Sequence, residues 1–153
     1  MDPTAMDFWF TMGSTYTYLT VMRLEDVVRS AGLAVRWRPY SLRTLFQEMN
    51  IMPFPDGGPK TKYMWRDIER RASAYGLPAR LPAPYPIKDS TSANSVALLG
   101  MQEGWGTTFV RTAYQRWFHF GEENGSEPNM RTALEASGQN YDRVMEQASG
   151  VKI

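Results

Sequence analysis

The chain has 153 residues, and its 17 Lys and Arg against 16 Asp and Glu give a formal net charge of +1. It contains no cysteine, which excludes a disulfide framework, a thiolate metal site, a CxxC redox centre and a cysteine nucleophile. The single histidine, His119, excludes a multi-histidine metal site and disfavours a serine–histidine triad, so we predict that the protein binds no metal.

The charge and hydropathy patterns also limit which classes of partner we expect. A balanced charge gives no electrostatic reason to expect nucleic acid as a partner. The apolar runs are only a few residues long, and the N-terminus lacks the basic-then-apolar order of a signal peptide. We therefore expect no membrane partner and a cytoplasmic location.

Residues 1–40 are predicted to form a strand, a helix and a second strand. The short aromatic segment Met6–Thr11 is typical of a strand, and Gly13 after it permits a sharp turn. Ser14 or Thr15 can cap a helix whose apolar residues repeat at helical spacing up to a stop at Gly32. Ala34–Pro39 alternates as a half-buried strand does, so we predict a parallel βαβ unit.

Residues 41–150 are predicted to be mostly helical and to form a second, helical domain. Apolar periodicity and capping residues predict six further helices and a proline-rich extended connection between the second and third. The predicted segments are Ser41–Met49, Lys60–Tyr75, a helix capped by Asp89 or Ser90, 107–120, and a last pair ending at Gly138 and Gly150. Met52–Pro59 is a loop rich in Pro and Gly. Because a sheet of two strands leaves both edges open, we expect the chain to self-associate or to unfold easily.

Ser14 is the foremost candidate for chemistry. It lies between a strand and a helix N-terminus, where a hydroxyl can donate to a bound thiolate and keep its pKa low. The alternative is an ordinary capping serine. Lys60, at the start of a helix, could bind a carboxylate or be a solvated lysine. Asn50 could hydrogen-bond a peptide-like ligand or simply form a turn.

Other polar features have structural interpretations. We interpret His119, between two phenylalanines, as a packing or surface residue, and Asp67 and Arg71 as a helical ion pair. The run Gly57–Lys60 lacks the spacing of a phosphate-binding loop, and we reject that interpretation. The many aromatic and methionine side chains could line an apolar cleft that suits a planar hydrophobic substrate.

An ordered series of motifs points to a known family. The segment Asp7–Leu19, which reads DFWFTMGSTYTYL, resembles the opening of 2-hydroxychromene-2-carboxylate isomerases and kappa-class glutathione transferases, in the DsbA-like branch of the thioredoxin fold. Further similar features follow in order: Trp37-Arg38-Pro39-Tyr40, Asn50 before a proline-rich loop, Lys60-x-x-Tyr63-Met64-x-x-Asp67, Gly76-Leu77-Pro78, Tyr85-Pro86 and the helix with Trp117.

This resemblance implies an α/β fold of the thioredoxin-like (DsbA-like) type, with a βαβ start and a large all-helical insertion. It also implies that the last strands of the thioredoxin unit, with their cis-proline loop, are missing here. Ser14 stands at the position where the family replaces the first thioredoxin cysteine and contacts the sulfur of glutathione, the implied cofactor. Asn50 and Lys60 fall at glutathione-contacting positions. Thr15 and Gln47 depart from the family's usual proline and lysine.

The resemblance implies a glutathione-dependent cis/trans isomerase acting on intermediates of aromatic-compound breakdown. A kappa-like glutathione transferase is the alternative enzyme, and a truncated, non-catalytic binding or assembly domain is the alternative outside catalysis. The implied partners are a small aromatic or hydrophobic substrate and a second copy of the chain in a homodimer.

Overall fold

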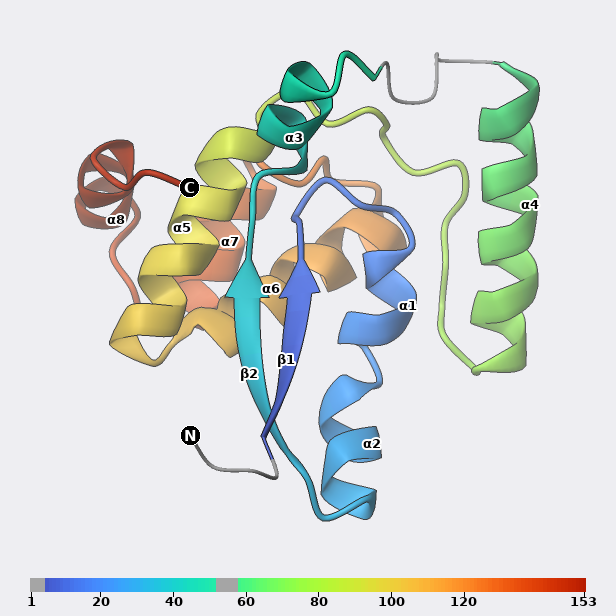
Figure 1. The fold of residues 1–153 in the computed structure, drawn as a ribbon, viewed down its shortest axis with the longest axis horizontal. Helices are drawn as coiled ribbons and strands as arrows, with labels where there is room; N and C mark the ends of the chain where they lie inside the picture. Colours follow the sequence, from blue (N-terminus) through green and yellow to red (C-terminus); the bar gives the residue numbers. More distant parts are fainter. Residues whose placement is uncertain (1–4, 52–57) are drawn as a thin grey trace.

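The computed structural model describes residues 5–51 and 58–153, so most of the predicted loop Met52–Pro59 lies outside the described residues. Figure 1 shows a small sheet surrounded by helices. The elements are β1 Ala5–Phe10, α1 Thr17–Val21, α2 Leu24–Ser30, β2 Ala34–Pro39, α3 Leu42–Glu48, α4 Pro59–Ala74, α5 Ser90–Glu103, α6 Gly106–Gln115, a π-helical turn η1 Arg116–Phe120, α7 Asn129–Ala136 and α8 Tyr141–Ser149.

The two strands pair in parallel, from Ala5 opposite Ala34 to Phe10 opposite Pro39, which confirms the predicted βαβ unit. One face of this sheet is aromatic, with the rings of Phe8 and Phe10 each packed edge-on against Trp37. The other face is polar. There Asp7 accepts hydrogen bonds from Arg36 and Arg38, and these two guanidinium groups hold the pKa of the Asp7 carboxyl below its usual range.

The aromatic face of the sheet belongs to one hydrophobic core that also includes the later helices. Figure 1 shows α6 passing behind the two strands, and α5 contacts β2 while α6 contacts α1, α5 and α7. The largest fully buried side chains of this core come from both ends of the chain and include Phe10, Tyr18, Phe109, Tyr114 and Trp117. Residues 1–40 and 41–150 therefore share their buried surface.

The helix predicted between Ser14 and Gly32 is in fact two helices, α1 and α2, interrupted at Met22 and Arg23. The periodic pattern conceals this break because the two helices bury their apolar side chains against different neighbours: α1 packs on α4 and α6, and α2 packs on β2. As a result α1 has only five residues, so the electrostatic contribution of the helix dipole near Ser14 is smaller than a longer helix would give.

The helix predicted over 107–120 also changes character along its length. Regular α6 ends at Gln115, and the π-helical turn η1 continues it to Phe120. This wider turn allows two consecutive large side chains, Trp117 and Phe118, to be fully buried. The other predicted helices are confirmed, including the cap of α5, where the Asp89 carboxylate accepts from the Ser92 N–H at 2.9 Å.

The proline-rich segment between α4 and α5 is extended, as predicted, and is tied to the turn η1. The Arg80 N–H donates to the Phe118 carbonyl at 2.7 Å, and the Trp117 indole N–H donates to the Pro84 carbonyl at 2.8 Å. In Figure 1 this segment runs beside α4 and separates it from the strands. Within residues 5–51 and 58–153, no helix has the length and apolar character needed to cross a bilayer.

Candidate functional site

The loop that leads from β1 to Ser14 is held by side chains that come from much later in the chain. The Met12 N–H donates to the Asn94 side-chain oxygen at 2.8 Å, and the Asn124 side-chain N–H donates to the Met12 carbonyl at 2.8 Å. Both asparagines are buried. Because buried backbone groups without partners are costly, these two amides fix the course of the loop.

Ser14 itself is held through its backbone. Its N–H donates to the Thr11 carbonyl at 3.1 Å, and the phenol of Tyr114 lies within 2.8 Å of the Thr11 carbonyl and 3.1 Å of the Ser14 carbonyl. Tyr114 is fully buried, and this burial raises the pKa of its phenol far above the ordinary value. The raised pKa favours the protonated phenol, which can donate to this loop.

The Ser14 side chain lies near the start of α1 but does not cap it. Its Oγ accepts from the Thr17 N–H at 3.4 Å, whereas Tyr16 is the residue at the N-cap of α1 and no side chain caps this helix, so the prediction that Ser14 or Thr15 is the cap is wrong. In the part of the chain that the structure describes, no group accepts the Ser14 hydroxyl hydrogen. A half-buried hydroxyl whose hydrogen has no acceptor among the described residues can serve as a donor to a ligand.

A cavity of about 770 Å³ opens between the end of β1 and α3, and we call it the α3 cavity; Gly13 lines it, whereas the adjacent Ser14 is not among its lining residues. Asn50 lines it, and with φ 52° Asn50 adopts the left-handed conformation just after α3, which confirms its turn-forming role as well. The full lining comprises Thr11, Gly13, Leu42, Arg43, Phe46, Gln47, Asn50, Ile51, Tyr85, Pro86, Ile87, Lys88 and Ser90. The structure thus brings Asn50 and the loop just before Ser14 into one cavity.

The charges in the α3 cavity are positive. Arg43 and Lys88 line it, and no carboxylate is among its lining residues. Lys88 is already engaged, because its ammonium lies 3.4 Å from the Glu123 carboxylate. Arg43 is exposed and makes no ion pair with any residue in the described ranges. It is therefore the cation best placed to meet an anionic ligand in this cavity.

Lys60 lies apart from this arrangement. It is exposed in the first turn of α4 and is not among the residues that line the α3 cavity. Its neighbours Thr61 and Lys62 instead line a second cavity, of about 730 Å³, which we call the α4 cavity.

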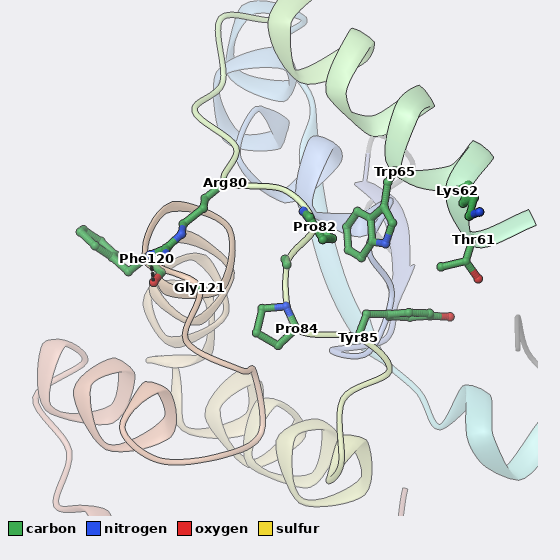
Figure 2. A pocket seen from close by; sticks show the side chains of 10 residues that line it. Thr61, Lys62, Trp65, Arg80, Pro82, Pro84, Tyr85, Phe120 and Gly121 are labelled. Carbon is green, nitrogen blue, oxygen red and sulfur yellow. Dashed lines mark hydrogen bonds between the residues drawn. The ribbon is translucent and has the colours of Figure 1, made fainter. Parts of the chain in front are cut away.

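The α4 cavity has aromatic walls and adjoins the α3 cavity at Tyr85, which lines both. Figure 2 shows Trp65 and Tyr85 facing the interior, with Pro82 and Pro84 between them and Arg80. The rings of Trp65 and Tyr85 are perpendicular, with centroids 6.0 Å apart. Burial raises the pKa of the Tyr85 phenol, so this wall is neutral.

His119 lines neither cavity. Its Nε2 lies 3.1 Å from the Tyr18 hydroxyl, which donates its own hydrogen to the Pro78 carbonyl, so Nε2 carries the proton and donates to Tyr18. Burial lowers the pKa of His119 and raises that of Tyr18 to about 12. The interpretation of His119 as a packing residue is thus confirmed, as is the ion pair of Asp67 and Arg71 at 2.9 Å. The described residues contain no group of three or more His, Asp or Glu side chains able to bind a metal ion.

Sequence reasoning missed the residues that support Ser14. Asn94 gave a local signal, since it is a polar residue within an apolar stripe of α5, and such residues are buried only when they are hydrogen-bonded. Tyr114 looked like any other core aromatic, and Asn124 and Arg43 gave no local signal. Their roles depend on contacts across about a hundred residues of sequence.

Comparison with known proteins agrees with this geometry. A family model for the DsbA-like thioredoxin domain matches residues 5–153, and the chain belongs to this family. Within it, the chain is 29% identical over 143 residues to a 2-hydroxychromene-2-carboxylate isomerase from Sphingobium xenophagum, covering 92% of this chain and 72% of that protein. It is 33% identical over 82 residues to the enzyme of the same name from Pseudomonas putida, covering 52% of this chain and 40% of that protein.

A solved structure shares the fold. The structure of a selenomethionine 2-hydroxychromene-2-carboxylate isomerase superposes with a TM-score of 0.78 at 22% identity, over 95% of this chain and 71% of that one. This likeness confirms the predicted thioredoxin-like α/β architecture with its small parallel sheet and mostly helical remainder.

Proposed function

We propose that this protein is a glutathione-dependent cis/trans isomerase that acts on aromatic-degradation intermediates of the 2-hydroxychromene-2-carboxylate type. Two curated relatives carry that enzyme's name, and they support an isomerase-like function. The observation that carries the glutathione part of the proposal is Ser14, a half-buried residue whose hydroxyl hydrogen has no acceptor among the described residues and whose neighbour Gly13 lines the cavity of about 770 Å³.

The residues of the α3 cavity fit glutathione. Its volume lies in the range of small-molecule sites, and glutathione is a tripeptide with two carboxylates and two amide groups. Arg43 would pair with one carboxylate and the Asn50 side chain with a peptide group, since an amide both donates and accepts. Lys60, which is not among the residues that line the α3 cavity, would reach a carboxylate of glutathione from outside it.

When bound, glutathione supplies a thiolate that adds to the conjugated double bond and leaves after rotation. The chain has no cysteine and therefore no thiol of its own for this chemistry. The task of the Ser14 hydroxyl is to donate a hydrogen bond to the sulfur and to favour its ionised form. The task of Asn94, Asn124 and Tyr114 is to keep Ser14 at a fixed position, which matters because misplaced catalytic groups lose much of their effect.

Calorimetric titration with glutathione tests the proposal, with Ser14→Ala as the variant and Ser73→Ala as a matched control on the exposed surface of α4. We expect saturable binding that Ser14→Ala weakens by about tenfold, the effect of one hydrogen bond to a charged group. Ser73→Ala should bind as the unmodified chain does. A folded sample that binds no glutathione would refute the proposal.

The same samples distinguish isomerase from transferase. With 2-hydroxychromene-2-carboxylate as substrate, an isomerase converts it while the concentration of glutathione stays constant. A kappa-like transferase consumes one glutathione per substrate molecule, which chromatography of the reaction mixture would detect.

A further inference from the structure

We propose that Tyr16 is a positioning residue, which fixes Lys60 on α4 relative to Ser14. It does so through one hydrogen bond, which the Tyr16 hydroxyl donates to Asp67 Oδ2 at 3.0 Å. As an account of ligand binding, this inference rests on the proposed function, in which Ser14 and Lys60 both contact glutathione. The position of Lys60 itself can be measured without any ligand.

The two residues that follow Ser14 both contact α4 through their side chains. The Thr15 hydroxyl lies 3.1 Å from the Met64 sulfur, which is a weak acceptor, and both of these residues are buried. Three residues further along α4, the Tyr16 hydroxyl reaches Asp67. Among the described helices and strands, α4 makes its main contact with α1, so these bonds set where α4 lies relative to the Ser14 loop.

Lys60 lies on the same face of α4 as these two contacts. Because residues three and four positions apart are neighbours on an α-helix, Lys60, Met64 and Asp67 follow one another along this face. Lys60 therefore lies one turn before Met64, which contacts the residue next to Ser14. A rotation or displacement of α4 would consequently move the Lys60 ammonium relative to the Ser14 hydroxyl.

Asp67 is a well-oriented acceptor for the Tyr16 hydroxyl. Its Oδ2 also accepts from Arg71 Nε at 2.9 Å, and only 21% of the Asp67 side chain is exposed. The hydrogen bond from Arg71 lowers the pKa of the Asp67 carboxyl, whereas burial raises the pKa of the Tyr16 phenol to about 12. Near neutral pH a protonated phenol therefore donates to an ionised carboxylate, and such charge-assisted bonds are stronger than neutral ones.

Apolar packing alone does not fix the rotation of α4 about its axis. Its buried side chains Met64, Ile68 and Ala72 contact the hydrophobic core, and apolar contact is non-directional. The hydrogen bond donated by Tyr16 is directional, because it weakens steeply as its geometry departs from linear. This bond therefore restricts the rotation and sliding of α4, and with them the position of Lys60.

The first test measures the position of residue 60 without ligand. Because the chain has no cysteine, Lys60→Cys and Arg29→Cys, the latter on an exposed part of α2, allow two nitroxide labels to be attached selectively. Double electron–electron resonance should give one narrow distance distribution, which Tyr16→Phe widens. Tyr63→Phe, a matched change at a residue of α4 that is 70% exposed, should leave it unchanged. An unchanged distribution in Tyr16→Phe would overturn the proposal.

The second test measures glutathione binding by calorimetry in a double-mutant cycle on the unlabelled chain. Tyr16→Phe should weaken binding about fivefold when Lys60 is present, but less than about twofold in the Lys60→Ala background, because the cation to be positioned is then absent. Equal weakening in both backgrounds would show a merely structural role for Tyr16 and would overturn the proposal. A widened distance distribution without any glutathione binding would reject the proposed function and leave the positioning of residue 60 by Tyr16 intact.

Discussion

Replacing Tyr114 by phenylalanine removes the hydroxyl that connects α6 to the backbone around Ser14. The Tyr114 phenol lies 2.8 Å from the Thr11 carbonyl and 3.1 Å from the Ser14 carbonyl. After the substitution the Thr11 carbonyl still accepts from the Ser14 N–H, but the Ser14 carbonyl loses this donor. The aromatic ring stays, so the packing of the core is preserved and the effect isolates the hydroxyl.

The free energy of unfolding should fall by about 2 kcal/mol. A buried hydrogen bond contributes about 1 kcal/mol net, and leaving its acceptor unpaired adds a cost of about 1 kcal/mol. For a domain of this size, each kcal/mol corresponds to about 2–4 °C in the melting temperature, so we expect a decrease of about 4–8 °C. A loosened Ser14 should also bind glutathione about fivefold more weakly, equivalent to about 1 kcal/mol.

Urea unfolding followed by circular dichroism, with glutathione calorimetry on the same samples, measures both effects. Tyr63→Phe is the matched control, because Tyr63 is 70% exposed and its hydroxyl makes no hydrogen bond with the described residues. We expect it to change stability by less than about 0.5 kcal/mol. If Tyr114→Phe were as stable as the control, the Tyr114 hydroxyl would not hold the loop, and the positioning argument for Ser14 would fail.

Three further changes test other parts of the structure. Burial lowers the pKa of His119 below its ordinary 6.5, so the unfolded chain binds the proton more readily; unfolding in urea should therefore become easier as pH falls through about 6.5, and His119→Gln should flatten this dependence. A Cβ on Gly106 would lie 2.5 Å from the Met101 backbone nitrogen and force α5 and α6 apart; Gly106→Ala should lower the free energy of unfolding by about 2 kcal/mol in the same assay. Trp9 is 64% exposed on the face of the sheet that also carries Asp7; Trp9→Ser should reduce self-association in sedimentation velocity, and an unchanged sedimentation coefficient would mean that this face is not involved.

Local patterns in the sequence were enough to predict most of the secondary structure. Alternation identified β1 and β2, and the capping residue Asp89 marks the start of α5. The parallel pairing followed from the helix between the strands. Such features depend on residues a few positions apart, which is why a sequence alone reveals them.

The elements whose structure differed from the prediction are those in which tertiary contacts override the local sequence pattern. The break between α1 and α2 arises because successive turns of one apolar stripe pack on different neighbours, and 51% of Val27 in that stripe remains exposed. The π-helical turn η1 arises because Trp117 and Phe118 both enter the core. A periodic pattern records that a residue is apolar but not which partner it meets.

The candidate site shows the same division between local and long-range information. Ser14 was identified from its position between a strand and a helix, a local signal. Yet the groups that fix its loop, Asn94, Asn124 and Tyr114, come from α5, from the segment after η1 and from α6. A segment limited to residues 1–40 would contain the serine without any of these partners. The helical part of the chain is therefore needed to hold the Ser14 loop, and substitutions in its buried polar residues should alter ligand binding as well as stability.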